Sequence, residues 1–196
     1  MVTDLAKVIA VVNIVDSTFT DNYFTGEGSS LIYIQNGLIS LRGNTFRNNG
    51  QIVSDQIYSI DGRFMHKYYQ EHGVVWVNNT GSSQLPRNYP PHVIESNIFR
   101  YLFAEYGVAT IMSQNQEVLM SNNTYQHVIS LKSGAILNTK GYKEFTTIMI
   151  QNETVDSIYA KTGGTVMVES EEPGLVNLIV RNTVFKNMRS SGGSAL

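Results

Sequence analysis

Six copies of one pattern divide this chain, and the repeat restricts its possible folds more than any other feature of the sequence. The copies are "VNIVDSTFTDN", "LISLRGNTFRNN", "HVIESNIFRYL", "EVLMSNNTYQHV", "TIMIQNETVDSI" and "LIVRNTVFKNM". Their central column holds Phe19, Phe46, Phe99, Tyr125, Val155 and Phe185. Successive members of this column are 27, 53, 26, 30 and 30 residues apart. A repeat in this range predicts a solenoid.

The columns before the aromatic position predict a strand and a bend. Five and seven residues earlier stand pairs that are apolar except for His92. These pairs are Val12/Ile14, Ile39/Leu41, His92/Ile94, Val118/Met120, Ile148/Ile150 and Leu178/Val180. Residues two apart share one face of a strand. Three residues before the aromatic stand Asp16, Gly43, Ser96, Asn122, Asn152 and Asn182. Because these residue types accept left-handed backbone, the column predicts a bend.

A small residue follows each aromatic and, in all copies but the last, opens another β-rich run. These residues are Ser30, Gly73, Gly107, Gly134, Gly164 and Gly193. The distance from the aromatic residue to the next small residue is unusually long between Phe46 and Gly73, and the step from Phe46 to Phe99 is about twice the others. These two irregularities locate two insertion loops, 50–72 and 78–91. Each repeat is therefore expected to run through a strand, a bend, an aromatic-centred segment, a second bend and another strand. Such a unit pairs its strands only by stacking on the next copy.

We therefore predict an all-β fold, a right-handed single-stranded parallel β-helix of about six coils of 26–30 residues. It forms one domain over residues 1–196, with the insertion in coil two. A leucine-rich repeat is disfavoured, because its characteristic leucine spacing is missing and no segment has a helical pattern. A β-sandwich would not explain identical columns. Since the chain starts on strand residues and stops after Gly192–Gly193, we expect it to be a fragment of a longer β-helix.

Two short motifs support this expectation. "FTDN" (residues 19–22) and "FRNN" (residues 46–49) fit F-x-x-N, whereas "SGAI" (residues 133–136) and "GGTV" (residues 163–166) approximate G-G-A-[I/L/V]. This pairing resembles the repeats of chlamydial polymorphic outer membrane proteins and of large protist surface proteins. The resemblance implies a pectin-lyase-like β-helix and a location at the cell surface or outside the cell. The later copies depart from it, with Leu102, Val128, Ile158 and Met188 in place of the asparagine.

Composition excludes several classes of partner. The net charge is -2, 15% of the residues are charged, and no basic cluster is present. We therefore expect no nucleic-acid partner. The apolar run near the start is too short to span a membrane, so no membrane-spanning segment is expected. There are no cysteines, which removes disulfides and zinc–thiolate sites.

The densest group of functional side chains is in the first insertion. The candidate ligand- or partner-binding residues are Asp61, Arg63, His66, Tyr68, Tyr69 and His72, together with Trp76. Long insertions on regular scaffolds often carry function. The alternative is an exposed loop that packs on the solenoid. Trp76 on an outward strand position could stack on a sugar, or the insertion could cover it.

No catalytic constellation stands out. The carboxylates are scattered, and Asp16 and Glu153 are interpreted as bend residues. The acidic run Glu169–Glu172 lacks calcium-loop spacing, so we predict neither metal nor cofactor. Three glycosylation sequons begin at Asn78, Asn122 and Asn152, of which Asn78 is the favoured candidate because it lies in a loop.

Two functions remain open. The first is a non-catalytic structural or interaction module of a larger surface, secreted or assembly-associated protein. Its partners would be other proteins or further coils of the same chain. The alternative is a polysaccharide-binding or polysaccharide-degrading domain. Catalysis would require at least two of the carboxylates Asp61, Glu71 and Glu95 to approach one another within a groove. A third idea is oligomerisation through the solenoid ends, where open strand edges would be exposed.

Overall fold

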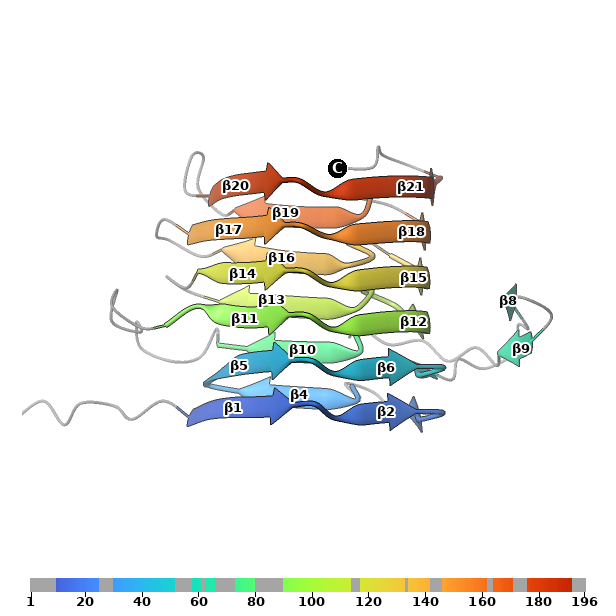
Figure 1. Cartoon of the computed structure of the whole chain (residues 1–196), viewed down its shortest axis with the longest axis horizontal. Helices are drawn as coiled ribbons and strands as arrows, with labels where there is room; N and C mark the ends of the chain where they lie inside the picture. The colour runs from blue at the N-terminus through green and yellow to red at the C-terminus, as the bar shows by residue number, and fades with distance from the viewer. Residues whose placement is uncertain are drawn as a thin grey trace, which may run out of the picture.

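Strands that recur once per repeat stack into three parallel sheets around a common axis (Figure 1). The computed structural model describes residues 10–24, 30–51, 58–60, 63–65, 73–79, 90–113, 117–132, 134–141, 146–161, 164–170 and 176–191. The first sheet contains β1 (Ala10–Val15), β5 (Gly37–Arg42), β11 (His92–Glu95), β14 (Val118–Ser121), β17 (Thr146–Gln151) and β20 (Val176–Arg181). Its strands pair in the order of the sequence.

The aromatic-centred segments form the second sheet, and the runs after the small residues form the third. The second sheet stacks β2 (Thr18–Thr20), β6 (Thr45–Arg47), β12 (Ile98–Ala104), β15 (Thr124–Ser130), β18 (Thr154–Ala160) and β21 (Val184–Ser190), with β3 (Tyr23–Phe24) and β7 (Gly50–Gln51) beside the first coils. The third sheet holds β4 (Ile32–Gln35), β10 (Val75–Asn78), β13 (Ala109–Ser113), β16 (Leu137–Gly141) and β19 (Val166–Ser170).

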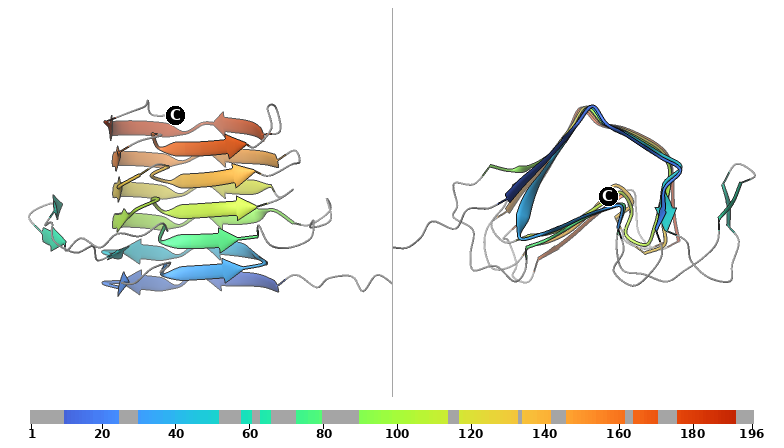
Figure 2. Two further views of the ribbon diagram at one scale, coloured as in Figure 1. Left: turned by 180° about the vertical axis from the view of Figure 1, so that it is seen from behind. Right: turned by 90° about the horizontal axis from the view of Figure 1, so that it is seen from below.

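These three sheets confirm the predicted parallel β-helix. In Figure 1 the strands of the first two sheets run from left to right in front, the third sheet returns behind them, and the chain climbs. This path is right-handed, as parallel crossover connections almost always are. The first two sheets have six strands each and the third has five. The described residues therefore complete five turns that include all three sheets, one fewer than the six coils expected. Figure 2 shows the sheets as three sides around one interior.

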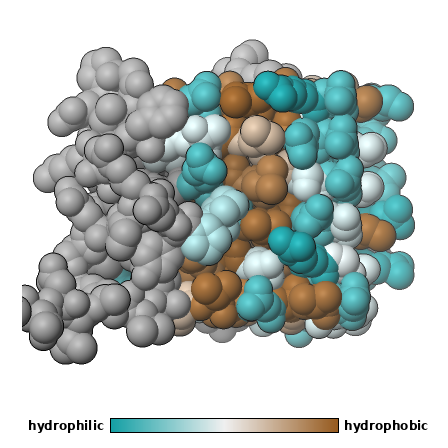
Figure 3. Space-filling view, turned by 60° about the vertical axis from the view of Figure 1, so that its left-hand side comes forward, coloured by the Kyte–Doolittle hydropathy of each residue, from teal (hydrophilic) through white to brown (hydrophobic). Residues whose placement is uncertain are grey.

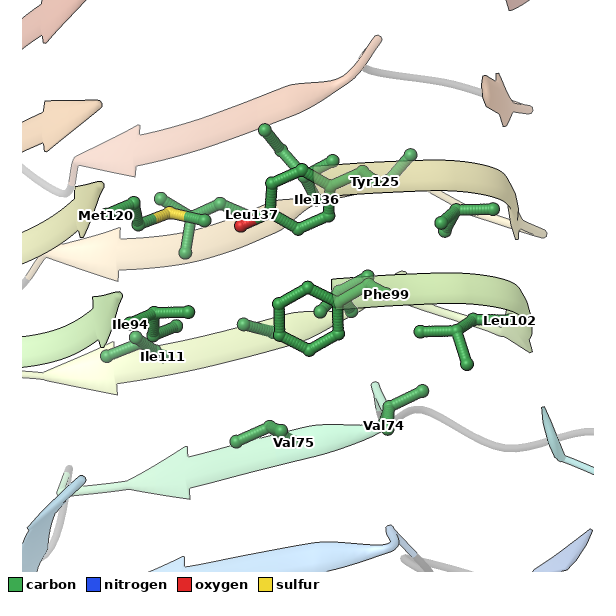
Figure 4. Packing of buried hydrophobic residues seen from close by; sticks show 14 of the residues in the cluster. Val74, Val75, Ile94, Phe99, Leu102, Ile111, Met120, Tyr125, Ile136 and Leu137 are labelled. Atoms are coloured by element: carbon green, nitrogen blue, oxygen red, sulfur yellow. The ribbon is translucent and has the colours of Figure 1, made fainter. Parts of the chain in front are cut away.

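Inward side chains from all three sheets fill this interior (Figure 4). The predicted apolar pairs of the first sheet point inward, and in the middle coils they are fully buried, as Ile94 and Ile150 are. The aromatic column stacks: Phe19–Phe46, Phe46–Phe99 and Phe99–Tyr125 have ring centroids 4.8–5.0 Å apart. This distance equals the spacing of strands in a sheet, so stacking one coil on the next also stacks the rings.

The predicted bend column has left-handed backbone in every coil. Its φ values run from 48° to 66° at Asp16, Gly43, Ser96, Asn122, Asn152 and Asn182. The small-residue bend is left-handed at Gly107, Gly134 and Gly164. A Cβ at Gly107 would lie only 2.3 Å from the carbonyl oxygen of Ala135 in the next coil, so glycine is required there for space as well as for conformation.

A further bend column lies inside the second sheet and was not predicted. Two residues after each aromatic, φ is again positive, between 51° and 57°, at Asp21, Asn48, Tyr101, His127, Ser157 and Asn187. Tyrosine is unusual with left-handed backbone, whereas histidine is, like asparagine and aspartate, found there more often than most residues. The rings of Tyr101 and His127 stack face to face with centroids 5.0 Å apart. The stack offers one physical reason why the coils keep these residues at a strained position.

Buried polar side chains form a ladder one residue after the first bend column. Its members are Ser17, Asn44, Asn97, Asn123, Glu153 and Thr183. Asn97 shows the pattern: its Oδ1 accepts the backbone N–H of Asn44 at 2.9 Å and the Asn44 Nδ2–H at 3.0 Å. Its own Nδ2 donates to the carbonyl oxygen of Leu41 at 3.0 Å. Each asparagine therefore pairs polar groups that the interior would otherwise leave unsatisfied.

The same geometry explains the asparagine of the F-x-x-N motif. Asn49 Oδ1 accepts the backbone N–H of Asn22 at 3.0 Å and its Nδ2–H at 2.9 Å, and Asn49 Nδ2 donates to the Phe19 carbonyl. In the later coils this position holds buried apolar residues such as Leu102 and Val128. The motif therefore marks an internal hydrogen-bond ladder in the first two coils, and apolar packing replaces it above them.

Candidate interaction surfaces

Only the outward-facing side chains can meet a partner, because the inward ones form the core. On the first sheet, strand register aligns one outward column across five coils: Ser40, Val93, Leu119, Met149 and Ile179. Its last four members are apolar, and we call them the apolar strip. Val93 is buried, whereas Leu119, Met149 and Ile179 are partly exposed. Figure 3 shows this strip running up the face of the first sheet.

A hydrophilic column borders the apolar strip. It contains Arg42, Glu95, Ser121, Gln151 and Arg181. Arg42 and Glu95 form an ion pair at 3.4 Å. An apolar centre with a polar border is the usual arrangement of a protein interface. A sugar-binding groove requires several hydrogen-bonding groups and stacking rings, and the outward side of the described first-sheet strands carries no aromatic residue.

A second surface lies on the third sheet, around Trp76. Trp76 is in β10 and points outward, since its strand neighbours Val75 and Val77 are buried in the core. Its ring lies 5.0 Å from that of Tyr33, tilted by 52°. Tyr33 is exposed at 47% of its surface. This pair is an outward aromatic platform, although tilted rings offer a sugar less flat area than parallel ones.

A third surface surrounds the Tyr101–His127 stack on the second sheet. Arg47 and Arg100 lie side by side in register there, and both are exposed. The two arginines make this spot locally basic on a chain whose net charge is slightly negative. Because their charges are alike and adjacent, they also repel each other. The spot holds no acidic neighbour in the adjacent register positions Thr20 and Gln126.

Most of the predicted insertion site lies outside the described residues. Asp61, His66, Tyr68, Tyr69 and His72 are among these, so their grouping stays a prediction. Arg63 begins β9 (Arg63–Met65), which pairs antiparallel with β8 (Tyr58–Ile60) in a separate two-stranded hairpin. Figure 2 places this hairpin beside the second sheet, on a different side from the third sheet that carries Trp76.

The three sequons fall in different settings. Asn78 ends β10 and is half-buried, and its carbonyl oxygen accepts the backbone N–H of Asn36 at 3.0 Å. Asn122 and Asn152 occupy exposed left-handed bends. A glycan needs an exposed asparagine side chain, so by exposure alone the two bend positions are the more accessible acceptors.

The carboxylates that the structure describes are engaged in pairs or stand apart. Glu105 forms an ion pair with Lys132 at 2.5 Å, and Lys132 Nζ lies 5.0 Å from the ring of Tyr106. Burial lowers the pKa of Lys132, but the Glu105 carboxylate outweighs it and leaves this pKa raised. Within the described residues no three His, Asp or Glu side chains gather as metal ligands. Asp61 and Glu71 lie outside them, so the proposed carboxylate groove with Glu95 stays untested.

Glu153 lies directly after the bend residue Asn152, and its role is structural, although it is not itself a bend residue. It is buried at 1% exposure within the asparagine ladder. Its Oε2 accepts the backbone N–H of Asn123 at 2.8 Å, and its Oε1 accepts the Asn123 Nδ2–H at 2.9 Å. Burial raises the pKa of this carboxyl to about 8, and the two hydrogen bonds only partly oppose the effect. A strong perturbation of this kind often marks a functional site, but here the group faces the core and other coils.

No family model, curated protein or solved structure matches this chain. The described segments contain no helix with the length and apolar character needed to cross a bilayer. Fold and surface together define the class of protein as a parallel β-helix with an apolar strip on one outer face.

Proposed function

We propose that this chain is a structural and interaction module of a larger surface, secreted or assembly-associated protein, and that it performs no catalysis. The apolar strip on the first sheet is the observation that carries this proposal. Its partly exposed members, Leu119, Met149 and Ile179, repeat at three successive coils, so they offer a partner a straight apolar ridge with regular spacing. Fold alone would not support a function, because β-helices carry many.

The proposal includes membership of the pectin-lyase-like superfamily and kinship with the surface-protein repeats described above. The hydrogen bond between Asn22 and Asn49 supports this kinship, because it gives the asparagine of the F-x-x-N motif a reason to recur. Gly107 and Gly134 have left-handed backbone, and a Cβ at either position would clash with nearby backbone atoms. This gives the glycine of the small-residue motif a reason to recur as well.

Site-specific photo-crosslinking tests the interaction role. A photoreactive phenylalanine analogue at position 149 should give one discrete crosslinked product in the cell or secreted material from which the chain comes. The same analogue at position 126, on the second sheet, is the matched control and should not give that product. Changing Leu119 to Glu should abolish it, because a charge would be placed in the centre of the ridge. No product at position 149, or equal products at both positions, would refute the proposal.

A carbohydrate-binding role is the second candidate, and the Tyr33–Trp76 platform favours it. Titration with polygalacturonate and other plant or microbial polysaccharides, followed by tryptophan fluorescence, addresses it directly, because Trp76 is the chain's single tryptophan. Saturable quenching that Tyr33→Ala weakens about tenfold would support this candidate. An unchanged spectrum with every polymer would remove it.

A further inference from the structure

One pair of neighbouring charges on the coil stack has the same sign. In the described sheets, charged residues are register neighbours at four places. Three of these pairs are opposite in sign: Arg42 with Glu95, Lys140 with Glu169 and Asp156 with Lys186. The fourth pairs Arg47 with Arg100 on the second sheet. Because like charges directly opposite each other destabilise a sheet, this pair works against the fold that carries it.

The two arginines keep their charges uncompensated on the surface. Both side chains are exposed. Neither guanidinium takes part in an ion pair or a hydrogen bond with any residue that the structure describes, whereas Arg42 forms an ion pair with Glu95. The pair lies in the second and third coils, with further coils on both sides, so additional coils at either end of the stack would leave it unchanged.

The acidic side chains on this face are bonded to other groups. Asp21 accepts hydrogen bonds from Thr20 Oγ1 and from Asn48 Nδ2, each at 3.0 Å. Asp156 lies two coils from Arg100 in the same column and accepts from Asn187 Nδ2 at 2.8 Å. Neither of these two carboxylates is bonded to either arginine, so the arginine pair is available to an anion from outside.

The residue after Arg100 is under backbone strain. Tyr101 has a φ of 54°, and a bulky residue with left-handed backbone is an outlier. Its ring stacks on the ring of His127, with the centroids 5.0 Å apart. Strained residues cluster at sites that clamp a ligand. The strain is a second observation, independent of charge, that favours a binding role for this part of the second sheet.

The spacing of the two arginines fits one tetrahedral anion. Strand neighbours lie about 4.8 Å apart. The rings that directly precede the arginines, Phe46 and Phe99, have centroids 5.0 Å apart. Each guanidinium presents parallel N–H donors that match the oxygens of a phosphate or carboxylate. A phosphate monoester has about −1.5 to −2 charge at pH 7 and three strong acceptor oxygens, so it can neutralise both arginines, whereas a carboxylate can neutralise one.

The side chain two positions before Arg100 indicates what carries the phosphate. Ile98 is on the same outward side of β12, is 37% exposed, and lies between Thr45 and Thr124 in its column. Residues two apart on an extended peptide are roughly 6.7 Å apart, which is also the separation of two such strand positions. An extended protein segment can therefore contact Ile98 and the arginines together. Recognition of an anionic membrane takes clusters of about 4–8 Lys or Arg, so a pair favours a protein partner.

We propose that Arg47 and Arg100 bind the phosphate of a phosphorylated serine or threonine on a partner protein, while Ile98 contacts an apolar residue two positions from it. The site lies on the second sheet and goes beyond the proposed function, whose apolar strip lies on the first. It also explains why the chain keeps two adjacent like charges, because residues that bind a ligand often do so at a cost to the fold.

An NMR titration of the full chain, observing the arginine Nε–H signals, tests this site. The probe is a short peptide with one phosphoserine and one leucine two positions away. It should cause saturable shifts at Arg47 and Arg100. The same peptide with serine or glutamate in place of phosphoserine should bind at least about tenfold more weakly, because hydrogen bonds to the doubly charged group are lost.

Variants assign the binding to named side chains. Arg47→Gln and Arg100→Gln should each weaken binding of the phosphopeptide about tenfold. Arg181→Gln removes an exposed arginine whose register neighbour is Gln151, and as the matched control it should leave binding unchanged. Ile98→Ser should weaken binding of the leucine peptide but not of the same peptide with glycine at that position.

The stability of the free protein gives a measurement that needs no ligand. Because repulsion is relieved, Arg47→Gln and Arg100→Gln should each raise the melting temperature by roughly 1–3 °C, while Arg181→Gln should not. A lower melting temperature for both variants would show that the arginines hold the coils together, and the proposal would then be wrong.

Equal binding of the phosphorylated and unphosphorylated peptides, or binding that survives the Arg47→Gln/Arg100→Gln change, would overturn the proposal. Cosedimentation with vesicles of phosphatidylcholine and a phosphatidylinositol phosphate, without binding of the phosphopeptide, would refute it in favour of a membrane. Photo-crosslinking at position 149 should persist in the double arginine variant, so failure of this site is distinguishable from failure of the proposed interaction role.

Discussion

At the scale of single residues, two buried groups depart from the repeat that surrounds them. Glu153 is the one carboxylic acid in a ladder of asparagine and hydroxyl residues, and Tyr125 stands where the aromatic stack otherwise has phenylalanine. The two groups influence each other: burial raises the pKa of Tyr125 well above its ordinary value of 10.0, and the nearby Glu153 carboxyl adds to the rise. Both departures have measurable consequences for stability.

Glu153 should make the protein less stable as the pH rises. The folded-state pKa of about 8 lies above the ordinary value of 4.5, so the folded protein holds a proton that the unfolded chain releases between these values. The stability that this group contributes is complete below pH 4.5 and is lost as the pH rises through about 8. Each pKa unit of difference corresponds to about 1.4 kcal/mol.

Denaturant titrations at several pH values check this expectation. Glu153→Gln keeps an oxygen that can accept from Asn123 and removes the titration, so its advantage over the wild type should grow from about pH 5 to about pH 8. Glu117→Gln, at an exposed position, is the control and should show no such trend. A difference between the Glu153→Gln variant and the wild type that stays constant with pH would contradict the assignment.

Tyr125→Phe should stabilise the protein. The Tyr125 hydroxyl is buried and has no hydrogen-bond partner within the described part of the chain. Leaving such a group unsatisfied costs on the order of 1–3 kcal/mol, so its removal should raise the free energy of unfolding by about 1 kcal/mol. Tyr33→Phe removes an exposed hydroxyl and should change little. Chemical denaturation of the two variants gives the comparison, and a loss of stability in the Tyr125→Phe variant would show that the hydroxyl is satisfied.

At the scale of the elements, the bends set the geometry of each coil. Ser96 has a φ of 57° and an exposed side chain, so its backbone conformation can be tested without disturbing the core. Ser96→Gly should stabilise the protein by up to about 1 kcal/mol, because glycine adopts this conformation without steric cost. Ser96→Val should destabilise it by about 1–2 kcal/mol, because a β-branched residue is strained there.

Thermal unfolding of the two variants provides the measurement, with Thr147→Val on an extended outward position as the control. Equal melting temperatures for Ser96→Gly and Ser96→Val would mean that the bend does not constrain the coil.

The elements also show what sequence can and cannot predict. The inward pairs are apolar except for His92, the central column is aromatic except for Val155, and the first bend recurs in every coil, so columns of like residues identify all three. The bend inside the second sheet was missed because Tyr101 and His127 do not resemble the small polar residues of the same column, and their mutual stacking is visible only in three dimensions. The ladder was missed because Ser17, Asn44 and Glu153 look unrelated until hydrogen bonding reveals their common role. A polar residue recurring directly after each bend was the available signal.

At the scale of the whole molecule, stability should vary along the axis. A solenoid coil contacts only its neighbours, so a middle coil has two stabilising interfaces and an end coil has one. Amide hydrogen exchange at submicromolar concentration should therefore be slowest in β12, β15 and β17 and fastest in β1, β2, β20 and β21. Uniform protection from end to end would contradict this expectation.

The polar ladder also has a consequence for how this protein can vary. Four of its five backbone-to-side-chain hydrogen bonds measure 2.8–2.9 Å, although the paired residues are separated by 26, 27, 30 or 53 positions in the chain, and the fifth, from Glu153 to Thr183, measures 3.4 Å. The spacing of the coils along the solenoid axis therefore does not depend on how many residues lie between two ladder residues. Doubling the length of a loop adds only about 0.6 kcal/mol of closure entropy. Segments between rungs are therefore free to lengthen, shorten or be exchanged during evolution while the frame stays fixed. The coil can accordingly acquire new recognition loops without redesigning its core.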